Sequence, residues 1–382
     1  MNLPPLAAPA ARPAPANRAR LWVQRLTLLS VVTLLLLGML ELLLAFAPGL
    51  FGERRLNEVY SRYDIRPGGI YVREKRAGMR FMWPSFSTEN YWNGYRWQHA
   101  TDERGFRNPP GAAADVLLLG DSLIYGHGVE EPETVSAFLR AEFGMGAYNM
   151  GRQGAALFDE YVFLRTWLPE LRPRSVVLFV FLNDFDDLEV YRTAEQIATM
   201  PEIDRIDYAA IRQWAGELAS RMPAAPRRWL ARRPSLRLLR SAAKELRSLA
   251  LTTPAWAADF PADPPFLAPL QDPDRRARLG TYYTRILGDL AERCRSRGIE
   301  LSVVYLGAGS DPQSYQPAQE LAVDLVRAAA VEGGSPFFDS REAFSGCDEC
   351  FLPRDGHFTP VDHRRLARFV SETVLVRETG AP

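Results

Sequence analysis

The chain has 382 residues and a formal net charge of zero, with 47% hydrophobic and 24% charged residues. This composition is ordinary for a globular protein and excludes a strongly basic nucleic-acid binder, so we expect no nucleic-acid partner. Three cysteines are too few for a disulfide-stapled scaffold in a chain of this size. The length allows one large domain with an anchor and insertions.

The N-terminal region predicts a membrane anchor. Residues 1–25 are rich in Pro, Ala and Arg, and we expect a disordered cytoplasmic tail there. Residues 26–47 are almost continuously apolar, and a helix of about 20 residues spans a hydrocarbon core of roughly 30 Å. Because arginines precede this span, the positive-inside rule places the chain after Pro48 outside the cytoplasm. The prediction is a single-pass protein of the inner (cytoplasmic) membrane with a periplasmic domain.

A cleaved signal peptide is the alternative to this anchor. Ala45-Phe46-Ala47 has the small-x-small form of a cleavage site. The apolar run is longer than a signal-peptide core, however, and Pro48 would directly follow the cut, so an uncleaved anchor is favoured. Within the span, Glu41 is expected to snorkel toward the outer end or to be protonated. A partner helix in the membrane is the alternative role for this residue.

The remaining elements follow in chain order. Residues 48–110 contain many aromatic and turn residues, and we expect an extracytoplasmic spacer with irregular extended structure. Short apolar runs then alternate with helical patterns over residues 111–378. The predicted strands are Val116–Leu119, Ala147–Met150, Ser175–Leu182, Leu301–Leu306 and Phe337–Asp339. The predicted helices are Thr134–Phe143, Phe158–Leu168, Arg276–Arg297, Ala318–Ala330 and Val361–Val374. This alternation indicates an α/β domain whose parallel sheet is covered on both faces.

Residues 185–270 interrupt the alternation with helical pieces, prolines and a basic stretch. Within it, Leu236 and Leu239 share an apolar helical face, and Arg237 and Arg240 lie elsewhere. We expect an amphipathic helix packed on the domain, with adhesion to an anionic membrane surface or anionic polymer as the alternative. The insertion is interpreted as a lid or a substrate-binding elaboration.

Three residues fit the requirements of a hydroxyl nucleophile. Ser122 directly follows the first predicted strand, where a parallel sheet places functional side chains. Asp355 and His357 precede the last predicted helix, and a carboxylate beside a histidine fixes the tautomer of a base. The order Ser, Asp, His occurs in α/β-hydrolase triads. Taken alone, a serine after a strand is more often a helix N-cap.

Other polar positions lie at the same sheet edge. Gly151 and Asn183 end the second and third strands, and a backbone N–H and a side-chain amide are good donors to an oxyanion. The Ser122 N–H is the remaining expected oxyanion donor. Singly, Gly151 and Asn183 also fit ordinary turn or cap residues. Candidate pocket residues are Asp121, His127 and Asp184, with His127 interpreted as a pocket-wall residue.

Together these segments resemble the SGNH, or GDSL-type, hydrolase superfamily. The matching blocks are Gly120-Asp121-Ser122-Leu123, Asn149-Met150-Gly151-Arg152-Gln153-Gly154, Asn183-Asp184 and Asp355-Gly356-His357-Phe358-Thr359-Pro360. The resemblance implies Ser122 as nucleophile, His357 as base and Asp355 as its partner. It also implies a flavodoxin-like three-layer sandwich with a five-stranded parallel sheet.

Two departures from the family pattern bear on function. Phe181 stands where the third block usually has glycine, and the fifth block is Asp-x-His, which resembles the branch with bacterial exopolysaccharide acetyl-transfer proteins. The leading hypothesis is hydrolysis or transfer of a small acyl group on an extracytoplasmic glycan. Candidate partners are an acylated glycan and proteins of a polysaccharide assembly system. The alternatives are a non-catalytic glycan-binding or assembly component, and a lipase or lysophospholipase.

Cys347 and Cys350 precede the Asp355 loop and are a candidate disulfide in an extracytoplasmic domain. A redox motif lacks its strand-to-helix context, and a zinc site lacks a second ligand pair. Cys294 is expected to be buried in a helix. We therefore expect no metal and no cofactor.

Overall fold

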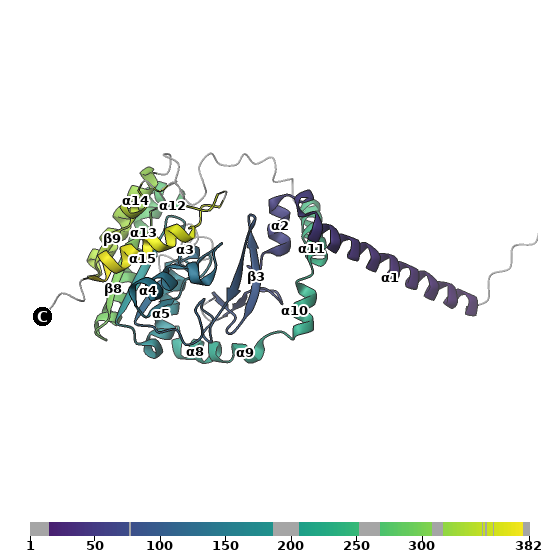
Figure 1. The fold of residues 1–382 in the computed structure, drawn as a ribbon, viewed down its shortest axis with the longest axis horizontal. Helices are drawn as coiled ribbons and strands as arrows, with labels where there is room; N and C mark the ends of the chain where they lie inside the picture. The colour runs from purple at the N-terminus through teal and green to yellow at the C-terminus, as the bar shows by residue number, and fades with distance from the viewer. Residues whose placement is uncertain are drawn as a thin grey trace, which may run out of the picture.

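The computed structural model describes residues 15–75, 78–185, 206–251, 268–307, 316–345, 347, 350–353 and 355–376. Helix α1 (Pro15–Phe46) runs away from the rest of the chain (Figure 1). The most apolar part of its segment Ala19–Phe46 has a mean hydropathy of 2.5. Only 6% of that part is buried against the rest of the protein. This helix is long and apolar enough to cross a membrane, and a signal sequence would pass the same test.

The main domain is built on a parallel sheet of five strands, in the order β6-β5-β7-β8-β9. The strands are β5 (Val116–Leu119), β6 (Ala147–Asn149), β7 (Ser175–Val180), β8 (Glu300–Tyr305) and β9 (Phe337–Asp339). The first strand of the sheet lies between the second and third, which is the order of flavodoxin-like folds. The predicted α/β class and the five predicted strands are confirmed, with ends that differ by at most two residues.

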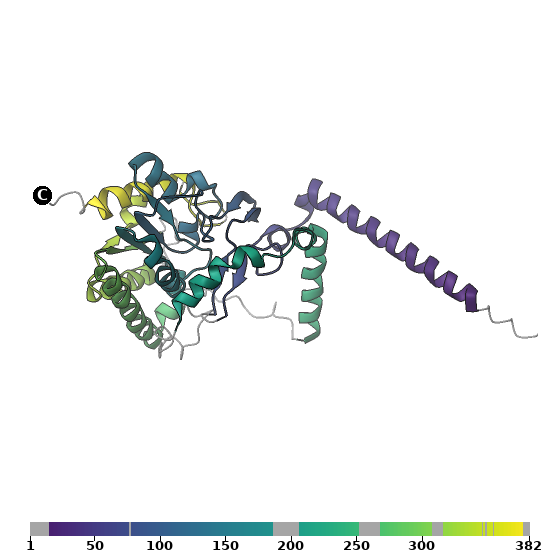
Figure 2. The same ribbon diagram turned by 90° about the horizontal axis from the view of Figure 1, so that it is seen from below.

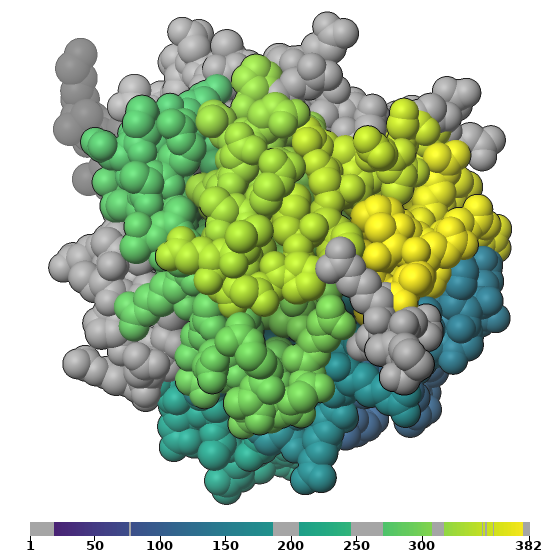
Figure 3. All heavy atoms as spheres, turned by 90° about the vertical axis from the view of Figure 1, so that its left-hand side faces the viewer, coloured from purple at the N-terminus to yellow at the C-terminus, as the bar shows by residue number. Residues whose placement is uncertain are grey.

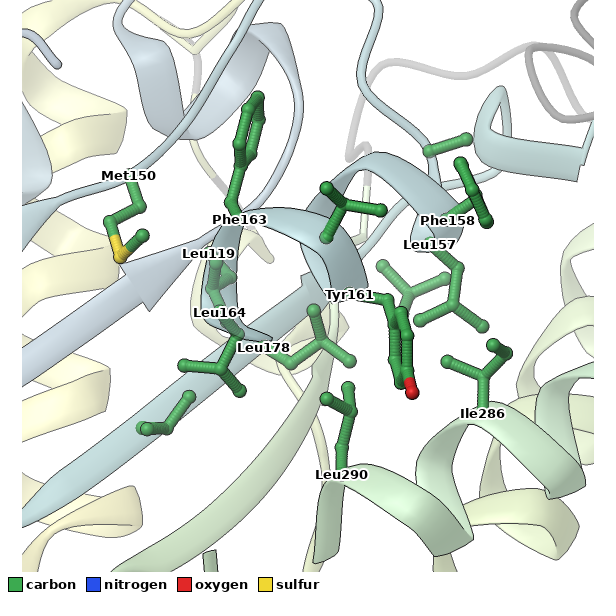
Figure 4. Packing of buried hydrophobic residues seen from close by; sticks show 14 of the residues in the cluster. Leu119, Met150, Leu157, Phe158, Tyr161, Phe163, Leu164, Leu178, Ile286 and Leu290 are labelled. Carbon is green, nitrogen blue, oxygen red and sulfur yellow. The ribbon is translucent and has the colours of Figure 1, made fainter. Parts of the chain in front are cut away.

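Each face of the sheet is buried because strand residues alternate between two apolar cores. Leu117 and Leu119 belong to one core and Val116 and Leu118 to the other. The first core is completed by α5 (Leu157–Leu171), α13 (Pro273–Arg295) and α14 (Gln316–Glu332). Figure 4 shows Tyr161 of α5 close to Ile286 and Leu290 of α13. The second core is completed by α4 (Val135–Phe143) and α15 (Pro360–Phe369). The three-layer arrangement is therefore confirmed.

Helices close the side of the domain that faces away from α1. The C-terminal third of the chain covers most of this side (Figure 3). Helices α13 and α14 pack against each other there, and α15 lies on the other face of the sheet. Cys294 of α13 is buried, as predicted. Short helical turns complete the domain: α3 (Ser122–Tyr125), η2 (Glu131–Glu133), η7 (Arg341–Phe344) and the π turn η8 (Val370–Val374). Strands β5, β6 and β7 are buried throughout, whereas the edge strand β9 is half-buried.

The segment expected to be irregular is more regular than predicted. It contains η1 (Pro48–Leu50), α2 (Glu53–Tyr60), and the antiparallel hairpins β1 (Tyr71–Arg73) with β2 (Arg80–Met82) and β3 (Ser87–Trp92) with β4 (Tyr95–Ala100). The β3–β4 turn is Asn93-Gly94, and both residues have positive φ, 47° and 92°. Asn-Gly is the strongest short hairpin signal in a sequence, because this turn requires positive φ twice. The segment therefore contains a helix and two hairpins in addition to the irregular extended structure that was expected.

The insertion is helical where it is described, and residues 186–205 and 252–267 lie outside the described part. Its elements are α8 (Tyr208–Gly216), α9 (Leu218–Arg221), α10 (Ala225–Ala231), α11 (Pro234–Leu251) and α12 (Ala268–Gln271). The amphipathic helix predicted here is α11, but its buried side differs from the prediction. Arg237 is 5% exposed, whereas Leu239 is 50% exposed. Arg237 is buried because it donates to the carbonyl oxygens of Glu58 and Ser61, at 3.2 and 2.7 Å.

Glu41 connects α1 to this insertion. Its Oε1 accepts hydrogen bonds from the Ser235 hydroxyl at 2.8 Å and the Ser235 N–H at 3.3 Å. Ser235 lies in the first turn of α11, where backbone N–H groups lack partners within the helix and favour a carboxylate. In Figures 1 and 2, α11 lies beside the end of α1 that meets the domain. Glu41 therefore contacts a helix of the same chain, which neither sequence interpretation anticipated.

Arg107 is the main polar connection between the N-terminal segment and the loop after α3. Its side chain is fully buried. It donates to the carbonyl oxygens of Gly126, Val129 and Gln98, at 2.5, 2.6 and 3.0 Å. Two buried carbonyl groups and one partly buried carbonyl group thus depend on one guanidinium.

We expect Arg107→Ala to lower the free energy of unfolding by about 3 kcal/mol or more, because buried acceptors lose a charged donor. For a chain of 382 residues this corresponds to a fall in Tm of roughly 4 °C. Thermal unfolding of the full chain in detergent measures the change. The control is Arg174→Ala, since the Arg174 side chain is 81% exposed. Equal Tm values for the two variants would contradict this account of Arg107.

Candidate active site

Ser122 lies where β5 passes into α3. Asp121 is the N-cap residue of α3 and accepts a hydrogen bond from Leu123 N at 2.8 Å. The chain can turn directly after the strand because residue 120 is glycine: a Cβ there would lie 2.4 Å from the Ile124 side chain. Ser122 is 4% exposed, and its Oγ lies 3.3 Å from Asp121 Oδ2. The serine is both the first residue of a short helix and part of a hydrogen-bonded group.

The C-terminal loop brings His357 to this serine. His357 Nε2 lies 2.9 Å from Ser122 Oγ. Asp355 Oδ2 lies 3.2 Å from His357 Nδ1. Both residues precede α15, whose N-terminus is fixed by a capping box between Thr359 and Asp362. The structure therefore places the three predicted residues in one continuous chain of contacts.

Asp355 also contacts a second histidine. His127 Nε2 lies 3.1 Å from Asp355 Oδ2, and the rings of His127 and His357 are stacked at 3.9 Å between centroids. Asn93 Nδ2 donates to Asp355 Oδ1 at 3.3 Å. Burial raises the pKa of Asp355, but the hydrogen bonds from His127 and His357 outweigh it and hold the pKa below its usual value. Asp355 is thus ionised and held by three side chains.

His127 is held in its neutral form. Burial lowers its pKa to about 4, and the nearby His357 acts in the same direction, although Asp355 opposes both. A neutral His127 that donates from Nε2 to Asp355 accepts at Nδ1, where the Tyr63 hydroxyl lies at 2.9 Å. Gln153 Oε1 is also 2.9 Å from Nδ1. His127 was predicted to be a pocket-wall residue, and the structure places it against the Asp355 carboxylate.

Sequence reasoning missed Tyr63, Asn93 and Gln153 as parts of this site. Asn93 lies in the hairpin turn, and its Asn-Gly signal was visible in the sequence. Gln153 lies inside a block that was already quoted for the family resemblance. Tyr63 lies far from the other site residues in sequence, in a segment that we expected to be irregular, and no local signal identifies it.

Two of the three predicted oxyanion donors, Gly151 and Asn183, lie near α3, and both have other partners. The Gly151 N–H donates to Asn149 Oδ1 at 2.8 Å. A Cβ at residue 151 would lie 2.3 Å from Tyr125 N, so only glycine allows this close approach to α3. The Asn183 side chain is hydrogen-bonded to the Asp121 carboxylate. As oxyanion donors, Gly151 and Asn183 would have to share or exchange these partners, and their role stays a prediction.

The other predicted pocket residues are buried carboxyl groups. Asp184 accepts from Phe181 N at 2.8 Å and thereby supports the turn after β7. Burial raises the pKa of Asp121. Sequence reasoning missed Glu160 of α5, which is fully buried and has no hydrogen-bond partner among the described residues. Burial raises its pKa well above the usual value, and the charge of Asp121 adds to this, so Glu160 is protonated.

Two groups of side chains have the spacing of metal ligands within the described residues. The first is His127, Asp355 and His357, and the second is Cys347, Cys350 and Asp362. In the first group both imidazoles face the same carboxylate oxygen, at 3.1 and 3.2 Å, which is also the arrangement expected of a histidine pair oriented by a carboxylate. In the second group the cysteines form a disulfide, as the sequence suggested, and a disulfide offers no thiolate ligand.

Comparisons with known proteins give no sequence match. No protein-family model matches the chain, and no curated protein is significantly similar to it. Among solved structures, TesA is similar over 68% of this chain and 98% of its own, with 15% identity and a TM-score of 0.37. The α/β hydrolase LAE5, from the metagenome of Lake Arreo, covers 68% of this chain and 95% of its own, with 15% identity and a TM-score of 0.35. A mutant of the acetylxylan esterase Axe2 from Geobacillus stearothermophilus covers 71% and 96%, with 14% identity and a TM-score of 0.34. At these low scores, the fold assignment rests on the sheet order itself.

The neutral state of His127 predicts a pH effect on stability. An unfolded histidine binds a proton as the pH falls through about 6.5, but His127 in the folded protein does so only at about 4. Between these values the unfolded state binds more protons, so stability falls with decreasing pH. Wild type should therefore lose about 2 kcal/mol more than His127→Gln between pH 7 and pH 5. Denaturant unfolding at both pH values measures this difference, and parallel losses in the two proteins would show that His127 is protonated when folded.

Proposed function

We propose that this protein is an SGNH-type serine ester hydrolase or acyl-transfer enzyme. It acts on O-acyl groups, such as acetyl, of an extracytoplasmic glycan. The observation that carries the proposal is the line of contacts from Ser122 Oγ to His357 Nε2 at 2.9 Å and from His357 Nδ1 to Asp355 at 3.2 Å. A nucleophile, a base and an orienting carboxylate in this order are the parts of acyl transfer through a serine ester.

The first half-reaction follows from these contacts. As Ser122 Oγ attacks the ester carbonyl carbon, its proton passes to His357 Nε2. Asp355 accepts a hydrogen bond from Nδ1–H and stabilises the imidazolium that forms. When the tetrahedral intermediate collapses, the bond to the alcohol oxygen breaks and His357 returns the proton to that oxygen. The products are the free alcohol and an acyl-serine.

The second half-reaction releases the acyl group. His357 accepts a proton from water or from a sugar hydroxyl as its oxygen attacks the acyl-serine, and it then returns the proton to Ser122 Oγ. Water gives hydrolysis and a sugar hydroxyl gives transfer. Negative charge on the carbonyl oxygen would be stabilised by the N–H groups of Ser122 and Gly151 and the Asn183 amide. The Gly151 N–H would then share its proton between Asn149 Oδ1 and the oxyanion.

Two observations support a site outside the cytoplasm. The apolar helix Ala19–Phe46 is a candidate membrane span, and the arginines before it favour a cytoplasmic N-terminus. The Cys347–Cys350 disulfide is typical of oxidising compartments such as the periplasm. The proposed arrangement is one anchor helix in the inner membrane and a periplasmic enzyme. Proteins of a polysaccharide assembly system are the candidate partners.

We expect Ser122→Ala to lower kcat for p-nitrophenyl acetate by at least ~10³-fold, because the nucleophile is lost. Release of p-nitrophenol by the full chain in detergent measures the rate. The control is Ser296→Ala at the exposed end of α13, which should keep full activity. Unchanged activity in Ser122→Ala would contradict the assignment.

A non-catalytic binding role is the first alternative, and covalent labelling distinguishes it. A fluorophosphonate reacts with a serine that a neighbouring base activates. We expect wild type to be labelled at Ser122 and His357→Ala to lose the label, because the base is removed. Absence of label in the wild type would favour the binding role.

A lipase or lysophospholipase is the second alternative. A series of p-nitrophenyl esters from acetyl to lauryl tests it, because a lipase pocket gains about 0.8 kcal/mol per buried methylene. We expect kcat/KM to fall beyond the shortest acyl chains. A rise toward lauryl would contradict a glycan O-acyl substrate.

A further inference from the structure

A large cavity lies between helix α11, helix α2 and the hairpins. Its volume is about 1000 Å³. Figure 1 shows α2 and α11 together between α1 and the sheet domain, with β3 beside them. We call this cavity the basic groove, because six of its described lining residues are basic: Arg54, Arg66, Arg80, Arg237, Arg240 and Lys244.

The groove carries an excess of positive charge in a chain whose formal net charge is zero. Its described lining residues include only two acidic ones, Glu58 and Asp64. Asp64 pairs with both Arg66 and Arg237, at 2.9 and 3.0 Å. Both carboxylates are already paired with arginines of the protein. The net charge of the groove is therefore positive, and the groove attracts anions.

Two cations on α11 are available to a ligand. Arg240 and Lys244 are four residues apart, so they lie on one side of the helix, and both are exposed. Neither forms an ion pair with another described residue. The buried Arg237, one turn earlier, fixes α11 against α2 through the carbonyl oxygens of Glu58 and Ser61. The helix that carries the two exposed cations is therefore fixed in position.

The remaining lining suits a saccharide. The half-buried Tyr63 and Trp92 are aromatic lining residues. Asn57, Asn93 and Gln153 add polar amides, which also form hydrogen bonds within the protein. Ile65 is the one aliphatic side chain among the described lining residues. A lipid acyl chain is best matched by continuous apolar walls, whereas here charged and amide side chains stand among the aromatic residues.

The groove adjoins the candidate active site. Tyr63 and Gln153 both contact His127 Nδ1 at 2.9 Å, and Asn93 contacts Asp355 at 3.3 Å. These three side chains line the groove on one side and hold the two residues next to His357 on the other. A ligand in the groove is therefore one layer of side chains away from the triad.

We propose that the basic groove binds an anionic saccharide, so that the acyl groups removed or transferred at Ser122 are carried by a polyanionic glycan. This inference rests on the proposed esterase function and adds the charge of the substrate. Carboxylate, sulfate or phosphate groups on successive sugars would meet Arg240 and Lys244, while the sugar rings lie against the aromatic residues.

The test compares O-acetylated oligogalacturonate with an O-acetylated xylo-oligosaccharide of equal length, using the full chain in detergent. Acetate release gives kcat/KM for each. We expect the wild type to prefer the anionic oligomer. The double variant Arg240→Glu/Lys244→Glu should lower the ratio of the two kcat/KM values by about tenfold or more, since two attractive charges become repulsive.

The matched control changes the net charge equally, outside the groove. Arg227→Glu/Arg278→Glu alters two exposed arginines of α10 and α13 that do not line it, and it should keep the wild-type ratio. An equal fall in this control, or no preference in the wild type, would overturn the inference. A loss of binding to phosphatidylglycerol vesicles in Arg240→Glu/Lys244→Glu, with its oligosaccharide ratio unchanged, would also overturn it in favour of a lipid surface.

Binding without turnover separates this inference from the proposed function. Calorimetric titration of Ser122→Ala with de-esterified oligogalacturonate should show saturable binding that 0.5 M salt weakens. Binding that is absent while wild type hydrolyses p-nitrophenyl acetate would overturn the saccharide inference alone. Binding that is present while Ser122→Ala retains esterase activity would overturn the proposed function instead.

Discussion

The carboxylate of Asp355 is the point at which three separate segments of the chain meet. It receives contacts from two stacked imidazoles and one amide, which come from the loop before α15, the loop after α3 and the β3–β4 turn. A buried carboxylate is stable only when such partners compensate for lost water. The ionised state of Asp355, the orientation of His357 and the contact with Ser122 therefore depend on the N-terminal hairpins as well as on the sheet.

This dependence explains how the N-terminal segment contributes to the site. In a minimal α/β sandwich, the loops at the strand ends hold the reacting groups. Here the β3–β4 turn supplies Asn93, which contacts Asp355, and the chain after α2 supplies Tyr63, which contacts His127. The segment thus limits the positions that His127 can take, and it also forms one wall of the basic groove. Holding the site and lining the groove are tasks of the same residues.

The sequence predicted the sheet well and its surroundings poorly, for physical reasons. A strand buried on both faces is a continuous apolar run, so β5 matches its predicted bounds. Ser122, Asp355 and His357 follow from strand ends and from spacing within one loop. The contacts of Tyr63 depend on folding over a long stretch of chain, which local patterns do not encode. Arg237 shows a related limit, because a charged side chain was assigned to solvent and instead caps carbonyl groups in the interior.

The contact between Glu41 and Ser235 limits how far the domain can move relative to α1. A domain on a flexible tether can swing and search a wide volume above a bilayer. Here α1 is helical to Phe46, η1 and α2 follow within a few residues, and the carboxylate of Glu41 holds the first turn of α11. If α1 spans the membrane, the mouth of the groove stands at a fixed height and faces a fixed direction. An enzyme held in this way cannot search for its substrate. It would act on a polymer that emerges from the same membrane close to the groove.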